Sequence, residues 1–340
     1  MRHLVSVLPS VLLAIGFAAP VAADVITDWT EKALPIVATY SLGAPAYRDM
    51  AMMHVAMFQC VNAIEPLYQP YKGKLEAPPT TSKEAAAAVA AATVLSRLHP
   101  PDAGKIEAMR DRPRAPRRRR RVDDAGQRRR ERSRHLPPPD HARYGKTSTT
   151  RTPQQTETAR LWLYTGPSTF MPIAVQLSKA KPLSVAENAR LFALLSMETH
   201  DAIGAVLEAK YHYEFWRPVT AIRNGDIDGN EKTERDASWE PIGPTPMHPE
   251  YPCAHCIVAH AAGTVMQAFF GTGTVPEFTL TTPTAPGVTH RWTRIADYME
   301  EPSNARVWSG IHYRFSTKVG AEMGRKIAAY TLQNALKPVK

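Results

Sequence analysis

Cysteine is scarce in this chain: Cys60, Cys253 and Cys256 are the only three in 340 residues. So few thiols, and an odd number of them, exclude a fold held together by a framework of disulfides. Cys253 and Cys256 form a C-x-x-C pair, but no His follows it, which excludes covalent haem attachment. Three interpretations stay open: a disulfide or redox pair, part of a zinc site with His248 and His255, or two separate thiols. We favour separate thiols, with Cys256 a small buried residue.

Long apolar runs are also missing after the first 23 residues. A membrane-spanning helix needs about 18 or more apolar residues, so we expect no membrane span in the mature chain. The beginning is different: Arg2 and His3 precede an apolar run over 4–19, and small residues at 21–23 precede Asp24. This layout is typical of a secretory signal peptide cleaved after residue 23, and the alternative is an N-terminal membrane anchor. We therefore expect a periplasmic or secreted protein.

Acidic residues are scarce in the segment 110–143, where 5 Asp or Glu do not balance the positive charge of 14 Arg. That segment alone accounts for most of the formal net charge of +10. Three interpretations are open: a frame disruption in GC-rich DNA, a disordered solvated insert, or a nucleic-acid-binding tail. No aromatic residue is interleaved before Tyr144, so we expect no nucleic-acid partner. The Arg/Pro-rich segment, 110–146, divides a helical part over 24–109 from a second helical part over 147–340.

The chain as a whole has the composition of an ordinary folded protein, with 44% apolar residues. Apolar residues recur at helical spacing, and Ser184 with Glu187 forms a capping-box pattern. We predict an all-α bundle, and we treat His54, His200 and His290 as structural histidines. The expected helices cover 47–64, 82–98, 102–110, 152–162, 184–216 and 316–332. Two stretches are predicted to be surface loops: 271–286, and 224–230, where Arg235 stands at the position at which a calcium loop needs Glu.

The first candidate site segment is the end of the 184–216 helix. Lys210 and Arg217 are seven residues apart, which puts them on one stripe if the helix continues through both. Pro218 follows Arg217 and would end the helix there. Two cations would then face one point, near the negative end of the helix dipole.

Two later segments supply further groups of the same kind. Pro252 leads into an apolar helical run, so Cys253, Ala254 and His255 would lie at a helix start whose free N–H groups can hold an anion. Arg306 and His312 form the third segment. They would face different sides of a continuous helix, but Ser309-Gly310 is expected to break it and bring both to one site.

This order and spacing resembles the type 2 phosphatidic acid phosphatase and vanadium haloperoxidase superfamily over residues 150–335. The signature of that superfamily is Lys-x6-Arg-Pro, then Pro-Ser-Gly-His, then Ser-Arg-x5-His-x3-Asp. The positions that match are Lys210, Arg217, Pro218, Pro252, His255, Arg306 and His312. The positions that depart are Cys253 for Ser, Ala254 for Gly, Ala305 for Ser and Ser316 for Asp.

The resemblance implies a helical bundle of this type and a role for each site residue. His312 would bond to vanadium, as the single protein ligand to the metal, or attack phosphorus. His255 would be the general acid or base. Lys210, Arg217, Arg306 and the backbone N–H groups at Cys253 and Ala254 would hold the oxygens of vanadate or phosphate.

Two reactions remain possible at such a site. The Phe-Trp-Arg-Pro run and the His-Pro-x-Tyr-Pro entry resemble bacterial haloperoxidases, so we favour a vanadate-dependent peroxidase that oxidises halide with hydrogen peroxide. A free thiol at Cys253 would be oxidised in such a site. Ser316 removes the carboxylate that would orient His312. A phosphatase that acts on phosphate monoesters through a phosphohistidine is therefore the alternative, and an inactive oxyanion-binding exported protein is the third.

Overall fold

The computed structural model describes residues 24–41, 43–110, 150–227 and 233–339. The predicted signal peptide lies outside the described residues. So do residues 111–149, which include most of the Arg/Pro-rich segment, and residues 228–232, which include the end of the predicted loop 224–230. Within the described ranges, no helix is both long enough and apolar enough to cross a membrane.

Helices dominate the described residues, which confirms the predicted all-α class. The helices are α1 (Val25–Tyr40), α2 (Ala44–Ile64), α3 (Lys83–Leu98), α4 (Ala103–Arg110), α5 (Pro153–Leu161), α6 (Met171–Ala180), α7 (Val185–Tyr213), α8 (Pro218–Arg223), α9 (Ala254–Phe270), α10 (Ile295–Trp308) and α11 (Arg314–Asn334). Short 3-10 turns are η1 (Pro100–Asp102) and η3 (Pro167–Thr169).

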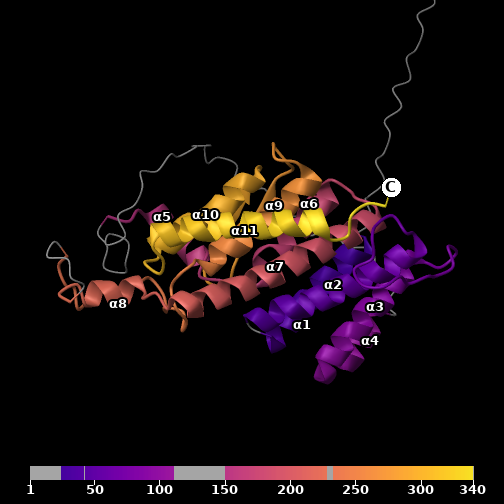
Figure 1. Cartoon of the computed structure of the whole chain (residues 1–340), viewed down its shortest axis with the longest axis horizontal. Coiled ribbons are helices and arrows are strands. Elements are labelled where there is room, and N and C mark those ends of the chain that lie inside the picture. Colours follow the sequence, from indigo (N-terminus) through magenta and orange to yellow (C-terminus); the bar gives the residue numbers. More distant parts are fainter. Residues whose placement is uncertain (1–23, 42, 111–149, 228–232, 340) are drawn as a thin grey trace, which may run out of the picture.

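The long helix α7 is the central element of the bundle. Figure 1 shows it running between α1–α4 on one side and α9–α11 on the other. Its start is the predicted capping box: Glu187 N–H donates to Ser184 Oγ (3.2 Å) and Ser184 N–H donates to the Glu187 carboxylate (2.8 Å). Leu191, Phe192 and Leu195 are fully buried, because helices cover α7 on both sides. Each such side chain contributes about 1.5–3 kcal/mol through burial.

One buried histidine joins three helices in this core. His54 of α2 makes hydrogen bonds with Thr30 Oγ1 of α1 (2.9 Å) and Ser196 Oγ of α7 (2.7 Å). Burial lowers the pKa of His54 to about 3, so the ring is neutral and its two nitrogens are satisfied by hydroxyl groups. This agrees with its predicted structural role.

The predicted surface loop 271–286 was partly wrong. It contains strand β1 (Phe278–Leu280), which pairs antiparallel with β2 (His290–Trp292). Phe278 and Leu280 point into the core, and Thr279 between them is half-buried. Alternation of this kind is the pattern of a strand that packs one face on a core, and a three-residue run is too short to be recognised among prolines and threonines.

Helices α9 and α11 lie unusually close together, and α9 carries part of the predicted site at its start. Gly320 and Gly324, one turn apart on α11, face α9. A Cβ on Gly324 would stand 2.2 Å from the Ile257 carbonyl oxygen, and a Cβ on Gly320 would stand 2.7 Å from the Cys253 carbonyl oxygen. The missing side chains therefore set how near α11 comes to the first turns of α9.

Candidate active site

Lys210 lies in the last turn of α7 and is fully buried. The helix ends three residues later because Glu214 adopts a left-handed conformation (φ +46°), and its N–H donates to the Lys210 carbonyl oxygen (2.9 Å). Lys210 Nζ donates to the carbonyl oxygens of Pro249 (3.0 Å) and Glu250 (2.6 Å). Burial, and then the positive charge of Arg217, lower the pKa of Lys210 to about 7.

Arg217 is not on the same helix as Lys210, so the predicted single stripe was wrong. Arg217 is extended (φ −79°, ψ 155°) and caps the start of α8, with Pro218 as the first helical residue. The physical reason is that proline keeps the preceding residue out of the helical region and itself fits a first helical turn. Arg217 still reaches the site: Nη1 donates to the Ile311 carbonyl oxygen (3.1 Å), and Nε and Nη2 donate to that of His248 (3.2 and 3.1 Å).

The start of α9 carries a disulfide between Cys253 and Cys256. The favoured interpretation as separate thiols was therefore wrong. The two residues are one helical turn apart, their Cα atoms lie 5.4 Å apart, and Cys256 N–H donates to Cys253 Sγ (3.3 Å). A Cα separation of this size suits a disulfide. Cys60 is the free cysteine of the chain.

Ala254 and His255 are the first two residues of α9, as predicted, so their backbone N–H groups belong to its open first turn. His255 is half-buried, and its Nε2 lies 3.2 Å from the Tyr164 carbonyl oxygen. A carbonyl oxygen can only accept, so Nε2 carries the proton and Nδ1 is the free acceptor. Burial, followed by the charge of Arg306, lowers the pKa of His255 well below its ordinary value.

Arg306 and His312 are brought together by the predicted break. Helix α10 ends at Trp308, and Gly310 adopts φ +74°, a conformation that glycine allows. Arg306 is buried, and its Nη1 donates to the Trp162 carbonyl oxygen (2.8 Å). Burial, followed by the charge of Arg217, lowers the pKa of Arg306 to about 9.

His312 stands between a guanidinium and a carboxylate. Arg217 Nη1 lies 3.2 Å from its Nε2, and Glu250 Oε1 lies 2.7 Å from its Nδ1. Burial, followed by the charges of Arg217, Lys210, Arg306 and His255, lowers the pKa of His312 well below its ordinary value. The ring is therefore neutral. Lys210 and Arg217 both donate to the Pro249 carbonyl oxygen, and Arg217 contacts His312, so these three predicted site residues lie together.

The cations of this site lack the partners that buried charges usually have. Lys210, Arg217 and Arg306 are at most 6% exposed, and in the described part of the chain none lies within 4.0 Å of a carboxylate oxygen. Arg306 Nε is buried without any hydrogen-bond partner among the described residues. Buried charges are normally paired, because desolvation is costly. The arrangement therefore fits a bound oxyanion such as vanadate or phosphate.

Two residues of this site were not assigned a role in it from the sequence. Glu250 accepts from His312, and His248 Nδ1 lies 3.1 Å from Arg217 Nη2. Burial is the main cause that lowers the pKa of His248 to about 4. Both belong to the His-Pro-x-Tyr-Pro entry before α9, and that run of residues was the signal that could have pointed to them.

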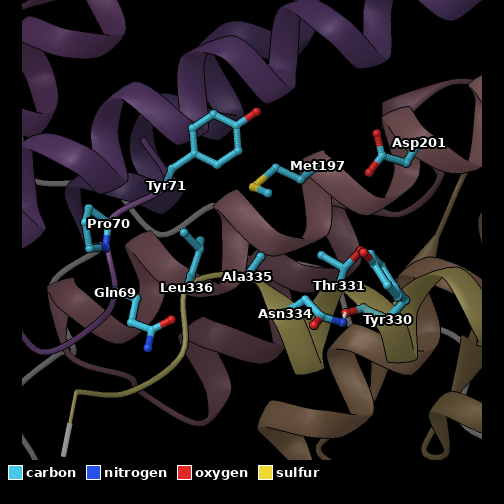
Figure 2. Close-up of a pocket in the computed structure, with 10 residues that line it drawn as sticks. All are labelled: Gln69, Pro70, Tyr71, Met197, Asp201, Tyr330, Thr331, Asn334, Ala335 and Leu336. Atoms are coloured by element: carbon cyan, nitrogen blue, oxygen red, sulfur yellow. Dashed lines mark hydrogen bonds between the residues drawn. The ribbon is translucent and has the colours of Figure 1, made fainter. Parts of the chain in front are cut away.

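A separate cleft of about 310 Å³ opens between the chain after α2, helix α7 and the end of α11. Figure 2 shows Tyr71, Met197, Asp201, Tyr330 and Asn334 among the residues around it. Its lining contains no Lys, Arg or His, and none of the predicted site residues. This cleft is unsuited to an oxyanion, so the site between α7, α9 and α10 is the candidate.

Comparisons with known proteins bear on the fold of the chain. Residues 190–340 match the family model of the VCPO second helical-bundle domain. A bacterial vanadium-dependent iodoperoxidase superposes with a TM-score of 0.66 and 18% identity, over 95% of this chain and 99% of that one. A bacterial vanadium-dependent chloroperoxidase in its holo form superposes with a TM-score of 0.61 and 13% identity, over 86% and 92%. Its apo form gives a TM-score of 0.61 and 14% identity, over 86% and 94%. No curated protein matches the chain in sequence.

The chain thus has the helical fold of the vanadium haloperoxidases. The family model and the structural matches together support the vanadium haloperoxidase and type 2 phosphatidic acid phosphatase superfamily, which confirms the resemblance seen in the motifs.

Proposed function

We propose that this protein is a vanadate-dependent haloperoxidase-like enzyme that oxidises halide with hydrogen peroxide. The observation that carries the proposal is the set of buried cations without carboxylate partners, Lys210, Arg217 and Arg306, gathered around two neutral imidazoles. Such a set stabilises a small oxyanion and the charge that develops on it during reaction.

Each side chain has a definable task. His312 offers the Nε2 lone pair, which Arg217 faces in the structure, as the single protein ligand to vanadium. The cations, with the N–H groups of Ala254 and His255, would hold the oxyanion oxygens. The Cys253 N–H, which the sequence also assigned to this role, donates to the Ser316 carbonyl oxygen (3.4 Å) instead. His255 accepts a proton from hydrogen peroxide at Nδ1, while Tyr164 keeps Nε2 protonated. When bound, vanadate supplies the Lewis acidity that activates the peroxide.

The disulfide removes one objection to peroxide chemistry at this site. A thiol at Cys253 would be oxidised stepwise in the presence of peroxide. In the disulfide both sulfurs are already protected from that route. The objection that the sequence raised against a peroxidase therefore does not apply to the structure.

A phosphatase remains the second candidate, because the unprotonated Nε2 of His312 is equally suited to attack phosphorus. An oxyanion-binding protein without turnover is the third. It is supported by the lack of a hydroxyl donor at position 253, where a disulfide sulfur cannot donate a hydrogen bond.

The test uses the purified protein with and without added vanadate. We expect halide oxidation by hydrogen peroxide that depends on vanadate, with vanadium bound at one per chain, and loss of both in His312→Ala. Hydrolysis of an aryl phosphate that vanadate inhibits competitively, without halide oxidation, would establish the phosphatase instead. Tight vanadate binding with neither activity would identify the oxyanion-binding protein.

We also propose that the protein is exported and that the mature chain begins at Asp24. The charged, apolar and small-residue order of the first 23 positions supports this, and so does the Cys253–Cys256 disulfide, since disulfides persist mainly in oxidising compartments. Mass spectrometry of protein recovered from outside the cytoplasm should show Asp24 as the first residue. Recovery with Met1 intact would disprove the cleavage.

A further inference from the structure

Glu250 is a buried carboxyl group whose strongest contact is His312. Its Oε1 accepts from His312 Nδ1 (2.7 Å) and from the Tyr313 backbone N–H (2.9 Å). The Glu250 side chain is fully buried, and that of His312 is 2% exposed. The two residues are 62 positions apart in the chain, so the contact is made by folding alone.

The superfamily pattern has its carboxylate elsewhere, four residues after this histidine. Here that position is Ser316, which is fully buried on α11 and carries no charge. A serine hydroxyl cannot replace a carboxylate as a strong acceptor for the imidazole. The structure instead brings a carboxylate to the same histidine from the segment before α9.

The two partners of His312 require the same protonation pattern. Arg217 can only donate, so the Nε2 that it faces must be the unprotonated nitrogen. Glu250 Oε1 already accepts from the backbone of Tyr313 and acts as an acceptor for Nδ1–H as well. An imidazole held in this way keeps its Nε2 lone pair on the side of the cations, where Arg217 Nη1 lies 3.2 Å away.

We propose that Glu250 is the positioning residue of His312, replacing the carboxylate that position 316 lacks: it holds the proton on Nδ1 and directs Nε2 to the bound oxyanion. The proposal rests on the proposed function insofar as His312 bonds to vanadium or phosphorus.

The backbone of Glu250 supports the same site. Its carbonyl oxygen accepts from Lys210 Nζ (2.6 Å), and its N–H donates to the Phe215 carbonyl oxygen (2.8 Å). These contacts do not involve the side chain. Substitutions at position 250 can therefore change the contact with His312 while the anchoring of Lys210 is kept.

The first experiment compares Glu250→Leu and Glu250→Gln with the wild type. Nitrogen NMR of the ring of His312, assigned with His312→Gln, reports the tautomer without any bound oxyanion. We expect Nδ1–H in the wild type and in Glu250→Gln, whose amide oxygen still accepts, and a mixture of tautomers in Glu250→Leu. Calorimetry with vanadate should show an affinity lowered roughly 10–100-fold in Glu250→Leu, the usual effect of removing the partner of a ligating histidine, and a smaller loss in Glu250→Gln.

A rescue and a control separate positioning from general structure. Adding Ser316→Asp to Glu250→Leu restores a carboxylate at the superfamily position and should recover both the Nδ1–H tautomer and the vanadate affinity. Glu198→Gln is the matched control: Glu198 is also fully buried, on α7, and neither of its oxygens has a hydrogen-bond partner among the described residues. It should change neither readout.

Failure of this proposal differs from failure of the proposed function. If folded Glu250→Leu keeps the pure Nδ1–H tautomer and the wild-type vanadate affinity, Glu250 does not position His312. If Glu250→Leu does not fold, a wild-type vanadate affinity in Glu250→Gln would overturn the proposal, whereas weaker binding would support it. A wild type that binds no vanadate would refute the proposed function, while the tautomer measurement would still decide the role of Glu250.

Discussion

At the scale of single residues, the site is defined by buried cations that make no direct ion pair with a carboxylate among the described residues. Lys210, Arg217 and Arg306 contact backbone carbonyl oxygens, which share but do not neutralise the positive charge. Desolvated cations of this kind destabilise the folded protein unless an anion joins them. A bound oxyanion at 100 times its dissociation constant would add about 2.7 kcal/mol of stability. These residues therefore favour the binding of an anion, and they do not stabilise the folded protein when no anion is bound.

The two histidines should differ in what their removal costs. His312→Ala should abolish vanadate binding and nearly all turnover, because it removes the lone pair that Arg217 faces. His255→Ala should leave vanadate binding measurable and slow turnover by roughly 10²–10⁴-fold, the scale of general acid–base catalysis. Calorimetry and steady-state kinetics on both variants check this. Full activity and full vanadate binding in His312→Ala would refute the assignment of the site.

Lys210 should make oxyanion binding dependent on pH. Its pKa in the folded protein is lowered to about 7 from an ordinary value of 10.5. Between these pH values the Lys210 side chain binds more protons in the unfolded chain than in the folded protein. Its contribution to the free energy of unfolding, with no anion bound, therefore rises with pH. Oxyanion binding needs the charged ammonium, so affinity should fall by roughly tenfold for each pH unit above about 7.

The measurement is phosphate or vanadate titration below and above pH 7, compared with Lys210→Met. The variant keeps the titration of the anion itself but loses that of the ammonium. A pH dependence that is the same in the wild type and in Lys210→Met would show that Lys210 stays charged throughout.

At the scale of elements, the contact of α9 with α11 holds the site in place. Gly324→Ala would drive a Cβ to 2.2 Å from the Ile257 carbonyl oxygen, which is backbone and cannot move aside. Overpacking of this kind typically costs about 1–3 kcal/mol. Gly320→Ala approaches the Cys253 carbonyl oxygen at 2.7 Å and should also weaken oxyanion binding, because it displaces the start of α9.

Gly204→Ala supplies the control for these glycines. Gly204 is exposed on α7, and a Cβ there meets nothing within 4 Å. The change should raise stability by about 0.5–1 kcal/mol, since alanine loses less conformational freedom in a helix. Denaturant unfolding of the three variants compares them directly. If Gly324→Ala were as stable as Gly204→Ala, the close approach of α9 and α11 would not be a constraint.

At the scale of the whole molecule, the parts before and after the Arg/Pro-rich segment share one core. Helix α7 is covered by α2 on one side and by α9 and α11 on the other, as Figure 1 shows. The hydrogen bond of His54 with Ser196 crosses the same boundary. The candidate site residues lie in the second part, but the helix that carries Lys210 packs on the first.

We therefore predict that residues 147–340 do not fold alone. The face of α7 that packs on α2 would be exposed, and such a fragment should aggregate or bind hydrophobic dyes as a molten state does. Coexpression with residues 24–109 should restore a soluble complex that binds vanadate. A 147–340 fragment that unfolds cooperatively and binds vanadate by itself would contradict this.

Much of this architecture could be predicted from local sequence. Capping at Ser184, the helix over 82–98 and the break at Ser309-Gly310 follow from interactions within a few residues, which any fold must respect. The spaced motifs likewise identified Lys210, Arg217, His255, Arg306 and His312, because their order and residue types suit oxyanion chemistry.

Only the tertiary structure decided which distant segments of the chain contact each other. The Glu250–His312 hydrogen bond joins residues 62 positions apart, and no local periodicity encodes such a contact. Arg217 lies beyond the end of α7, and its guanidinium reaches the site by donating to the carbonyl oxygens of residues 248, 249 and 311. Its position therefore depends on how three loops meet. The sequence determined which chemical groups are present and which helices carry them, because those follow from neighbours along the chain. Which carboxylate faces which imidazole was decided by packing, because it depends on which surfaces the bundle brings into contact.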